Sequence, residues 1–213
     1  ASIFLNNFNI DLSSLTGSQG WTVSNSGNAT GVRIRGSLHN DVLIGGTGRD
    51  TFDGNPGNNS ITGGGGYDLL SYSNGSQGTA GVSVNLITGS ATNTYGGFDT
   101  LTGIRELQGS IQNDILIGTN ILSRDAGLSG YPSNGTTFYG SLGSDQMNGT
   151  LVTGSNNVFY NSSLFNNSTI TVNFQDHDSA TVIKSIGGTD VLENVQGVHG
   201  TTGNDILNGS PTT

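Results

Sequence analysis

A nine-residue period between residues 36 and 71 constrains the fold of this chain more than any other feature of its sequence. Acidic or amide residues recur at this spacing, at Asp41, Asp50, Asn59 and Asp68. The four nonapeptides read Gly36-Ser-Leu-His-Asn-Asp-Val-Leu-Ile44, Gly45-Gly-Thr-Gly-Arg-Asp-Thr-Phe-Asp53, Gly54-Asn-Pro-Gly-Asn-Asn-Ser-Ile-Thr62 and Gly63-Gly-Gly-Gly-Tyr-Asp-Leu-Leu-Ser71. The second and fourth match the pattern G-G-x-G-x-D-x-U-x, where U is apolar, at every fixed position. Such a short period is typical of a solenoid, in which each repeat packs only on its neighbours.

Each nonapeptide divides into a turn and a short strand. The six residues Gly-Gly-x-Gly-x-Asp favour a turn, because glycine accepts backbone angles that are closed to other residues. The other three residues form a strand whose middle apolar side chain points inward, at Leu43, Phe52, Ile61 and Leu70. If the turns alternate between two sides of a flattened coil, each turn stacks on the turn two repeats away. The sequence therefore predicts an all-β fold, a parallel β-roll or β-helix solenoid with Gly/Asp-rich turns.

The composition agrees with this fold and excludes several others. The 213 residues include 36 Gly and no Cys, and 10% of them are charged. Glycine has no strict three-residue period, which excludes a collagen-like chain, and no stretch reaches the roughly 18 apolar residues of a membrane span. Lys and Glu are rare, so long amphipathic helices are not expected. The lack of Cys excludes a disulfide framework and cysteine-ligated zinc.

The net charge of −9 arises mainly from Asp, since the chain has 13 Asp and only 2 Glu. An acidic chain repels nucleic acid and anionic membranes, so neither is an expected partner. The short side chain of Asp suits tight turns. We therefore expect the acidic residues to lie in turns that hold cations.

Stacking of alternate turns predicts a calcium site between Asp50 and Asp68. Two carboxylates and several carbonyl oxygens form a set of hard oxygen ligands suited to Ca²⁺. The predicted ligands are Asp50, Asp68 and the turn backbone at Gly45, Thr47, Gly63 and Gly65. On the other side Asp41 stacks on Asn59, and the neutral amide predicts a weaker or empty site. Plain Asp-rich turns, capped by their own side chains, are the alternative.

A longer unit follows the nonapeptides and occurs twice. Asp99 and Asp114 lie fifteen residues apart, as do Asp190 and Asp205, and each pair is offset from its counterpart by 91 residues. Three modules end in apolar-x-Gly-[Ser/Thr]-x-x-Asn-Asp-x-Leu-x-Gly, at Asp41, Asp114 and Asp205. Further calcium ligands are predicted wherever a partner turn stacks on such a carboxylate, and the candidates are Asp99, Asp114, Asp145, Asp190 and Asp205. A turn with a purely structural role is the alternative for each.

The repeats divide the chain into four parts. Alternating apolar residues predict strands with one buried face, at Val82, Val84 and Leu86 and at Ile170, Val172 and Phe174. The predicted parts are an N-terminal cap or first coils over 1–35, four tandem nonapeptides over 36–71, a degenerate module over 72–154 with an insert at 119–154, and a second degenerate module over 155–213.

The nonapeptides resemble the calcium-binding repeats of the RTX (hemolysin-type) family of secreted bacterial proteins. The resemblance is close over 36–71 and looser over 72–118 and 155–209. It implies Ca²⁺ as the bound ion and an extracellular location. Because calcium is scarce inside cells and roughly millimolar outside, binding free energy would become folding free energy after export.

Other motifs have simpler explanations than catalysis. His177 lies between two Asp residues but fits no zinc spacing, so we expect a polar turn there. No Gly-x-Ser-x-Gly element stands between a strand and a helix, and the Gly-rich runs lack the Lys-Ser/Thr of a phosphate loop. Exposed aromatic residues would stack on sugars or neighbouring subunits, with about half of them in the core instead; the candidates are Tyr131, Phe138, Tyr139, Phe159 and Tyr160.

We therefore expect a secreted, calcium-binding solenoid without catalytic activity that acts as a structural or adhesive element outside the cell. Exposed strand ladders at the ends of a solenoid allow head-to-tail stacking into a surface layer or fibre. The expected partners are calcium ions, further copies of the chain, and neighbouring surface proteins or polysaccharide, with no insertion into a membrane. An accessory RTX module of a larger secreted enzyme and a carbohydrate-binding adhesin are the alternatives.

Overall fold

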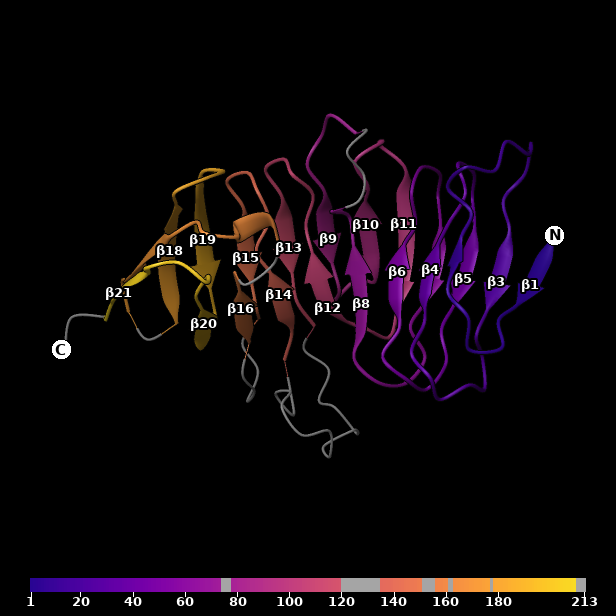
Figure 1. Ribbon diagram of the computed structural model, residues 1–213, viewed down its shortest axis with the longest axis horizontal. Helices are drawn as coiled ribbons and strands as arrows, with labels where there is room; N and C mark the ends of the chain where they lie inside the picture. The colour runs from indigo at the N-terminus through magenta and orange to yellow at the C-terminus, as the bar shows by residue number, and fades with distance from the viewer. Residues whose placement is uncertain (74–77, 120–134, 151–155, 161–162, 177, 210–213) are drawn as a thin grey trace.

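The strands of this chain wind into a coil whose two sides form two long β-sheets (Figure 1). The computed structural model describes residues 1–213 except 74–77, 120–134, 151–155, 161–162, 177 and 210–213. The coils stack along the long axis of the molecule, with β1 and β21 at its opposite ends (Figure 1).

The larger sheet lines one side of the coil and has 13 strands within the described residues. Their spatial order and bounds are β1 (Ser2–Phe4), β3 (Thr22–Ser24), β5 (Val42–Ile44), β7 (Ser60–Thr62), β11 (Phe98–Thr102), β10 (Ser90–Thr92), β9 (Ser83–Asn85), β13 (Ile115–Ile117), β15 (Gln146–Asn148), β19 (Thr189–Glu193), β18 (Ser179–Lys184), β17 (Ile170–Phe174) and β21 (Ile206–Asn208).

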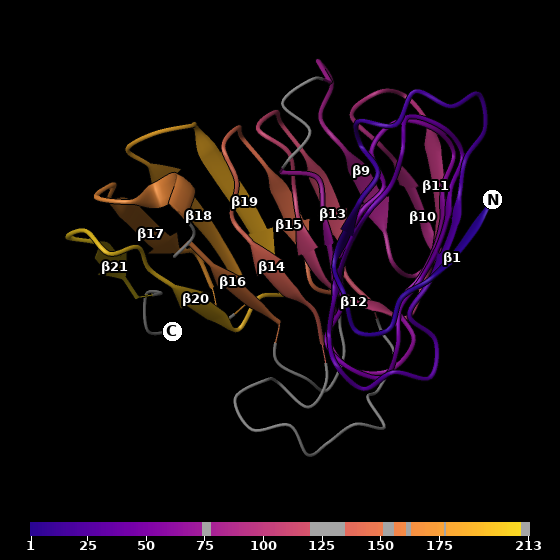
Figure 2. The same cartoon turned by 45° about the vertical axis from the view of Figure 1, so that its right-hand side comes forward.

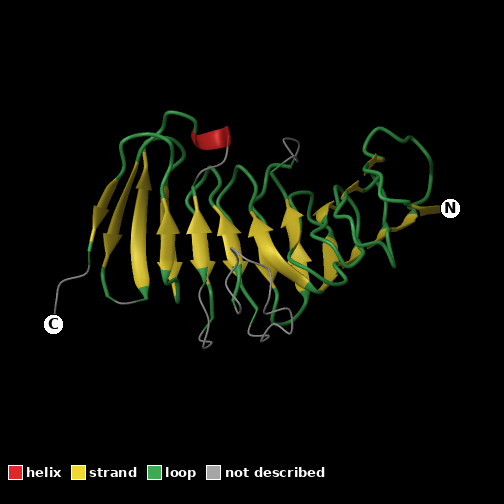
Figure 3. Cartoon of the chain, turned by 60° about the horizontal axis from the view of Figure 1, so that its bottom comes forward, coloured by secondary structure: helices red, strands yellow, loops and turns green. Residues whose placement is uncertain are grey.

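The smaller sheet faces the larger one and has eight strands in the same part of the chain (Figure 2). Their order and bounds are β2 (Ile10–Asp11), β4 (Arg33–Arg35), β6 (Thr51–Asp53), β8 (Asp68–Ser71), β12 (Ile104–Gln108), β14 (Thr137–Tyr139), β16 (Asn157–Phe159) and β20 (Gly197–His199). The one described helix, the short 3₁₀ turn η1 (Ser163–Phe165), lies at the edge of the coil (Figure 3). No helix of the described residues is long and apolar enough to cross a membrane.

Strands two nonapeptides apart pair in parallel, as the period predicts. Leu43 of β5 lies opposite Ile61 of β7 in the larger sheet, and Phe52 of β6 lies opposite Leu70 of β8 in the smaller sheet. All four side chains are at most 1% exposed. This confirms an all-β coil in which consecutive repeats alternate between two sheets, with one inward apolar side chain per short strand.

Residues 1–35 extend the same two sheets. The strands β1 and β3 pair in parallel on one side, and β2 and β4 pair in parallel on the other. Val23 and Ile34 continue the row of inward apolar side chains and are fully buried. The N-terminal segment therefore forms first coils of the roll.

The longer repeated unit contains an antiparallel meander that the parallel solenoid pattern does not predict. After β8 the chain moves ahead to β9 and returns through β10 to β11, which pairs in parallel with β7. The strand β13 then fills the next place beside β9. The strands β17, β18 and β19 repeat this path, with β19 beside β15 and β21 beside β17. The 91-residue offset in the sequence is thus a repeat of a three-dimensional unit.

Part of the predicted insert over 119–154 belongs to the roll itself. Residues 137–148 contain β14 and β15, which pair in parallel with neighbours in the smaller and larger sheet. Phe138 and Met147 point into the core from these strands. The segments 120–134 and 151–155 lie outside the described residues.

Candidate metal centre

Side-chain oxygens of the turns continue the hydrogen-bond pattern of each sheet. The residue that closes a turn accepts a hydrogen bond from the backbone N–H of the matching residue one coil earlier. The N–H of Asp50 donates to Asp68 Oδ1 over 2.8 Å, and the N–H of Asp41 donates to Asn59 Oδ1 over 2.9 Å. The N–H of Asn59 likewise donates to Asp99 Oδ1 over 2.9 Å. We call these rows of stacked turn residues carboxylate ladders.

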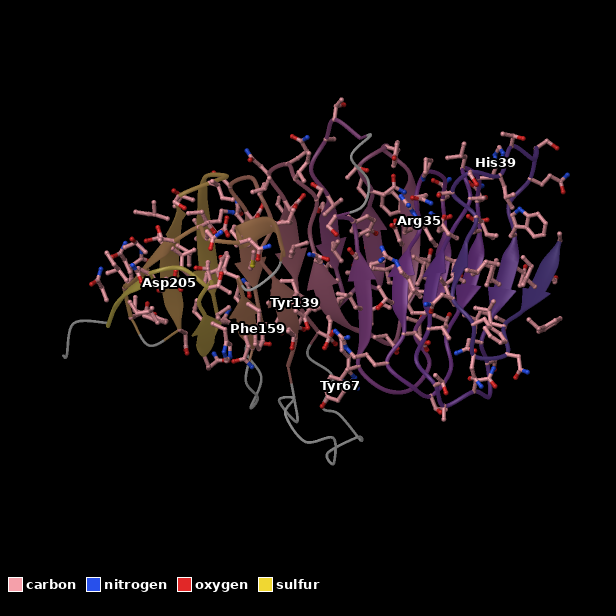
Figure 4. The ribbon with its side chains drawn as sticks, viewed as in Figure 1. Arg35, His39, Tyr67, Tyr139, Phe159 and Asp205 are labelled. Carbon is pink, nitrogen blue, oxygen red and sulfur yellow. The ribbon has the colours of Figure 1, made fainter. Side chains whose placement is uncertain are left out.

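Along the larger sheet, the row of Asp41, Asn59 and Asp99 is followed by another row, which we call the second carboxylate ladder. The N–H of Asp114 donates to Asp145 Oδ1, and the N–H of Asp145 donates to Asp190 Oδ1, both over 3.0 Å. Asp205, labelled near the C-terminal end in Figure 4, accepts from the N–H of Ile170 over 2.9 Å. The structure thus brings the predicted site residues together in stacks. Asp205 lies in the last described turn, so no further described turn stacks on it.

The first glycine of each turn faces the carboxylate that closes it. A Cβ on Gly63 would collide with Asp68 Oδ2, and a Cβ on Gly45 would lie 2.5 Å from Asp50 Oδ2. The turn over 63–68 also has left-handed backbone at Gly64 and Gly66, with φ of 99° and 91°. Glycine adopts these angles at no steric cost. The G-G-x-G-x-D pattern therefore makes room for a carboxylate against the backbone.

Neighbouring turns on this side are joined through their backbones. The N–H of Thr47 donates to the Asn28 carbonyl over 2.7 Å, and the N–H of Gly65 donates to the Gly46 carbonyl over 2.9 Å. Gly45 and Gly63 donate to strand carbonyls of the next coil, each over 2.8 Å. The predicted backbone positions thus stack as a unit around the two carboxylates.

Two buried carboxylate oxygens in this region have no hydrogen-bond partner among the described residues, namely Asp68 Oδ2 and Glu106 Oε1. Both residues are fully buried. The other oxygen of Glu106, Oε2, accepts a hydrogen bond from Arg49 Nε over 3.0 Å. By contrast, both oxygens of Asp50 have donors, with the N–H of Val32 on Oδ1 and the N–H of Gly46 on Oδ2. An unpartnered buried carboxylate is costly unless a cation binds it.

The electrostatics favour a cation at Asp68. Burial raises the pKa of this carboxyl to about 8, against the hydrogen bond from the Asp50 N–H, and the nearby charges of Asp50 and Glu106 raise it further. Burial also raises the pKa of Glu106, against the contact with Arg49. Among the described residues no three acidic or His side chains converge on one point. The unpartnered oxygens of Asp68 and Glu106 are hard oxygen donors of the kind that Ca²⁺ takes, so these two residues are the candidate calcium ligands near the Asp68 turn.

The three module endings hold their carboxylates in a different way, with a hydroxyl group. Ser37 Oγ donates to Asp41 Oδ1 over 2.9 Å, and Ser110 Oγ donates to Asp114 Oδ1 over 2.7 Å. The backbone N–H of each serine reaches the other oxygen, Oδ2. Thr201 makes the same two bonds to Asp205. We call the turns over 36–41, 109–114 and 200–205 the hydroxyl-capped turns.

Three residues that the sequence does not single out take part in these sites: Glu106, Arg49 and Lys184. Glu106 is one of only 2 Glu in the chain, and Lys184 is its only lysine. Lys184 lies between Asp145 and Asp190, where burial raises the pKa of Asp145 to about 7. The rarity of Glu and Lys in the sequence could have pointed to Glu106 and Lys184. The 91-residue offset, which aligns Lys184 with Asn93, could also have pointed to Lys184.

The aromatic candidates divide between the core and the outer face of the smaller sheet. Phe138 and Tyr160 are fully buried. Tyr139 and Phe159 come from the neighbouring strands β14 and β16 and lie side by side (Figure 4), with ring centroids 5.9 Å apart. His199 stacks on Phe159 at 3.9 Å. Tyr131 and His177 lie outside the described residues.

Stacked Gly/Asp turns around buried carboxylates, on a two-sheet parallel coil, define a calcium-binding β-roll. The model of the RTX calcium-binding nonapeptide repeat matches the chain over residues 35–70 and 198–211, in four copies. The chain therefore carries the calcium-binding repeats of the RTX (hemolysin-type) family, which confirms the resemblance seen in the nonapeptides. The second matched segment contains the last hydroxyl-capped turn. Comparison with curated proteins returned no match.

Proposed function

We propose that this protein is a secreted, non-catalytic β-roll that calcium stabilises outside the cell, where it serves as a structural or adhesive element by stacking end to end. The observation that carries this proposal is the open core at the last described coil. Leu207 of β21 is 55% exposed, whereas its partner Val172 in β17 is fully buried. Leu116 takes the same place in β13 and is also fully buried.

Apolar side chains are exposed near both ends of the roll. Ile206 is 56% exposed beside Leu207, and Phe4 and Phe8 are 81% and 71% exposed in the N-terminal coil. The outermost strands β1 and β21 each have one unpaired edge in the described sheet. A second copy stacked on the last coil would pair these edges and cover the apolar side chains, and such a head-to-tail contact continues into a filament.

Calcium supports a role outside the cell. RTX repeat proteins are generally secreted, and extracellular calcium is in the range that weak oxygen sites bind. The unpartnered oxygens at Asp68 and Glu106 give the folded roll a need for a cation. A non-catalytic role is supported by the carboxylates of Asp50 and Asp114, which accept backbone hydrogen bonds within turns.

The test is assembly of the purified protein in millimolar calcium and in EGTA, followed by electron microscopy and sedimentation. We expect filaments or sheets in calcium and dispersed, less folded chains in EGTA. Leu207→Asp places a charge on the open core and abolishes assembly. Ile115→Asp is the matched control, because Ile115 is 43% exposed on the outer face of a central strand, and this variant still assembles.

Monomers of the wild-type protein in calcium, folded and unchanged by Leu207→Asp, would contradict the proposal. Binding of such monomers to polysaccharide, lost when Tyr139 or Phe159 is replaced by Ala, would favour the adhesin instead. A catalytic domain in the same native polypeptide would favour an accessory module of a secreted enzyme.

A further inference from the structure

The only lysine of the chain is buried in the second carboxylate ladder. The side chain of Lys184 is 0% exposed, and so are the side chains of Asp145 and Asp190. Its ammonium Nζ lies 2.5 Å from Asp190 Oδ1 and 3.5 Å from Asp145 Oδ2. It also donates to the carbonyl oxygen of Ser141 over 2.8 Å. A buried ammonium persists only where such oxygens compensate its lost hydration.

These three oxygens are the kind of ligands that calcium takes in a stacked turn. Two of them are carboxylate oxygens from turns of successive coils, and the third is a carbonyl oxygen of the turn. Both carboxylates also accept a hydrogen bond from a hydroxyl group. Tyr160 Oη donates to Asp190 Oδ2 over 2.6 Å, and Ser141 Oγ donates to Asp145 Oδ2 over 3.0 Å. A calcium ion and the ammonium group would compete for the same oxygens.

The site around Asp99 matches the one around Asp190, with amide groups in place of the ammonium group of Lys184 and the carboxylate of Asp145. Asn93 precedes Lys184 by 91 residues, and its Nδ2 donates to Asp99 Oδ1 over 3.3 Å and to the Gly57 carbonyl over 2.8 Å. The stacked turn there closes with Asn59, whose Nδ2 donates to Asp99 Oδ1 over 3.0 Å. Tyr72 Oη donates to Asp99 Oδ2, as Tyr160 does to Asp190.

Two differences between the Asp99 and Asp190 sites compensate each other. Asp99 stacks on the amide of Asn59, whereas Asp190 stacks on the carboxylate of Asp145. Asn93 places an amide beside Asp99, whereas Lys184 places an ammonium group beside Asp190. With the shared Asp99 or Asp190, each set then carries a net charge of −1. The extra carboxylate and the extra cation therefore belong together.

We infer that Lys184 is a built-in cation that takes the place of calcium between Asp145 and Asp190, so that the C-terminal half of the roll folds without calcium. Asp145 and Asp190 are then not calcium ligands, although the sequence makes them candidates. Calcium dependence is confined to the consensus turns over 45–50 and 63–68, whose carboxylates have no lysine.

Hydrogen exchange of the wild-type protein in calcium and in EGTA tests this division. We expect amides of β6 and β8 to lose protection by about tenfold or more in EGTA, and those of β15 and β19 to keep theirs. Equal loss in β15 and β19 would overturn the inference. The experiment is done on dispersed protein, so its outcome does not depend on end-to-end assembly.

Substitution of the lysine provides a gain of binding as a second test. Lys184→Ser removes the ammonium and opens space between the two carboxylates, so calorimetric titration with Ca²⁺ should show one more bound ion than the wild type. The matched control is Lys184→Ser combined with Asp145→Asn, which removes one carboxylate and should not gain the ion. An unchanged number of ions in the single variant, or the same gain in both, would contradict the proposal.

A charge-neutral double variant keeps the test informative if Lys184→Ser fails to fold. Asp145→Asn with Lys184→Asn copies the amides of Asn59 and Asn93 at the Asp99 site into the Asp190 site. We expect this variant to fold in EGTA with protection of β15 and β19 close to that of the wild type. Lys184→Asn alone leaves two carboxylates without a cation and should lose that protection in EGTA and recover it in calcium. If β15 and β19 of Lys184→Asn kept their protection in EGTA, the role of Lys184 as a built-in cation would be overturned.

Discussion

The hydroxyl-capped turns and the consensus turn over 63–68 hold a buried Asp on the same backbone path by different means. In the turn over 109–114, the second residue is Ser110, whose hydroxyl and N–H groups each donate to one oxygen of Asp114. In the turn over 63–68, the second residue is Gly64 with left-handed backbone, and Asp68 Oδ2 has no partner in the described residues. One turn supplies its own donors, and the other leaves an oxygen for an external cation.

This difference assigns a physical meaning to the second position of the repeat. A Ser or Thr there donates its hydroxyl group to the carboxylate. Gly64 has no such group and leaves Asp68 Oδ2 for an external cation, although Gly46 still donates its N–H to Asp50 Oδ2. The division would let parts of one coil fold with calcium and other parts fold without it. The following predictions test that division, beginning with the largest expected effect.

Removal of calcium should destabilise the roll through the consensus turns. One site held at about 100 times its Kd contributes about 2.7 kcal/mol, which for a chain of this size lowers the Tm by roughly 5–11 °C when EGTA is added. Thermal melting followed by circular dichroism measures this shift. The variant Asp68→Asn should melt at nearly the same temperature with and without calcium. A wild-type Tm that EGTA leaves unchanged would contradict a calcium site at Asp68.

The calcium-free protein should lose stability as the pH rises. The folded pKa of Asp68 is about 8, above the ordinary value of 3.8 for an Asp side chain, so the folded state binds more protons than the unfolded chain between these values. This contribution is therefore complete below about pH 4 and is lost as the pH rises through about 8. Urea denaturation in EGTA at pH 5 and pH 8 measures the change. Asp68→Asn should reduce the slope, and an equal slope in that variant would refute the assignment.

The nonapeptide period predicts much of the fold because its contacts are local along the coil. A turn of six residues and a strand of three places Leu43 on Ile61 and Phe52 on Leu70, and both contacts are present. The meander over β9–β11 escapes this reasoning, since its forward step and return depend on a pairing with β7 that no local period encodes.

The candidate sites are predictable from sequence to a similar extent. The spacing of Asp residues indicates which turns stack, but a side chain that reaches in from another strand leaves no mark on that spacing. Glu106 enters from β12, next to the Asp68 turn, and Lys184 enters from the meander. The hydroxyl group of the module ending is visible in the sequence as a fixed Ser or Thr, yet its role as a donor to the carboxylate requires the geometry.

Loss of a hydroxyl cap should destabilise the roll by a similar amount with and without calcium. Ser110→Ala leaves Asp114 Oδ1 without the hydroxyl donor at 2.7 Å, and a lost hydrogen bond to a buried charged group costs about 1.5–3 kcal/mol. Chemical denaturation in calcium and in EGTA measures this loss. The control Ser83→Ala changes an exposed serine of β9 and should cost less than about 0.5 kcal/mol. A cost for Ser110→Ala that calcium removes would show that this turn already binds the ion.

Conversion of a hydroxyl-capped turn into a consensus turn should have the smallest net effect in calcium and separates the two turn types most directly. Ser110→Gly with Gln112→Gly changes the turn over 109–114 to the pattern G-G-x-G-x-D. In EGTA the double variant loses the hydroxyl donor and gains two flexible residues, so it should be less stable than the wild type by about 2–4 kcal/mol. In calcium it should regain about 1 kcal/mol or more, because the freed carboxylate of Asp114 becomes a ligand.

The single variant Gln112→Gly makes the fourth position flexible but keeps the hydroxyl group, so it serves as the control and should gain no response to calcium. Hydrogen exchange of residues 109–118 measures the response at the turn itself. A response in the double variant alone would establish that the second residue of the repeat decides between calcium and a hydroxyl group. If the double variant stays insensitive, the choice lies instead in the neighbouring coil, where Ser141 Oγ approaches Asp114 Oδ2 at 3.4 Å and still provides a donor.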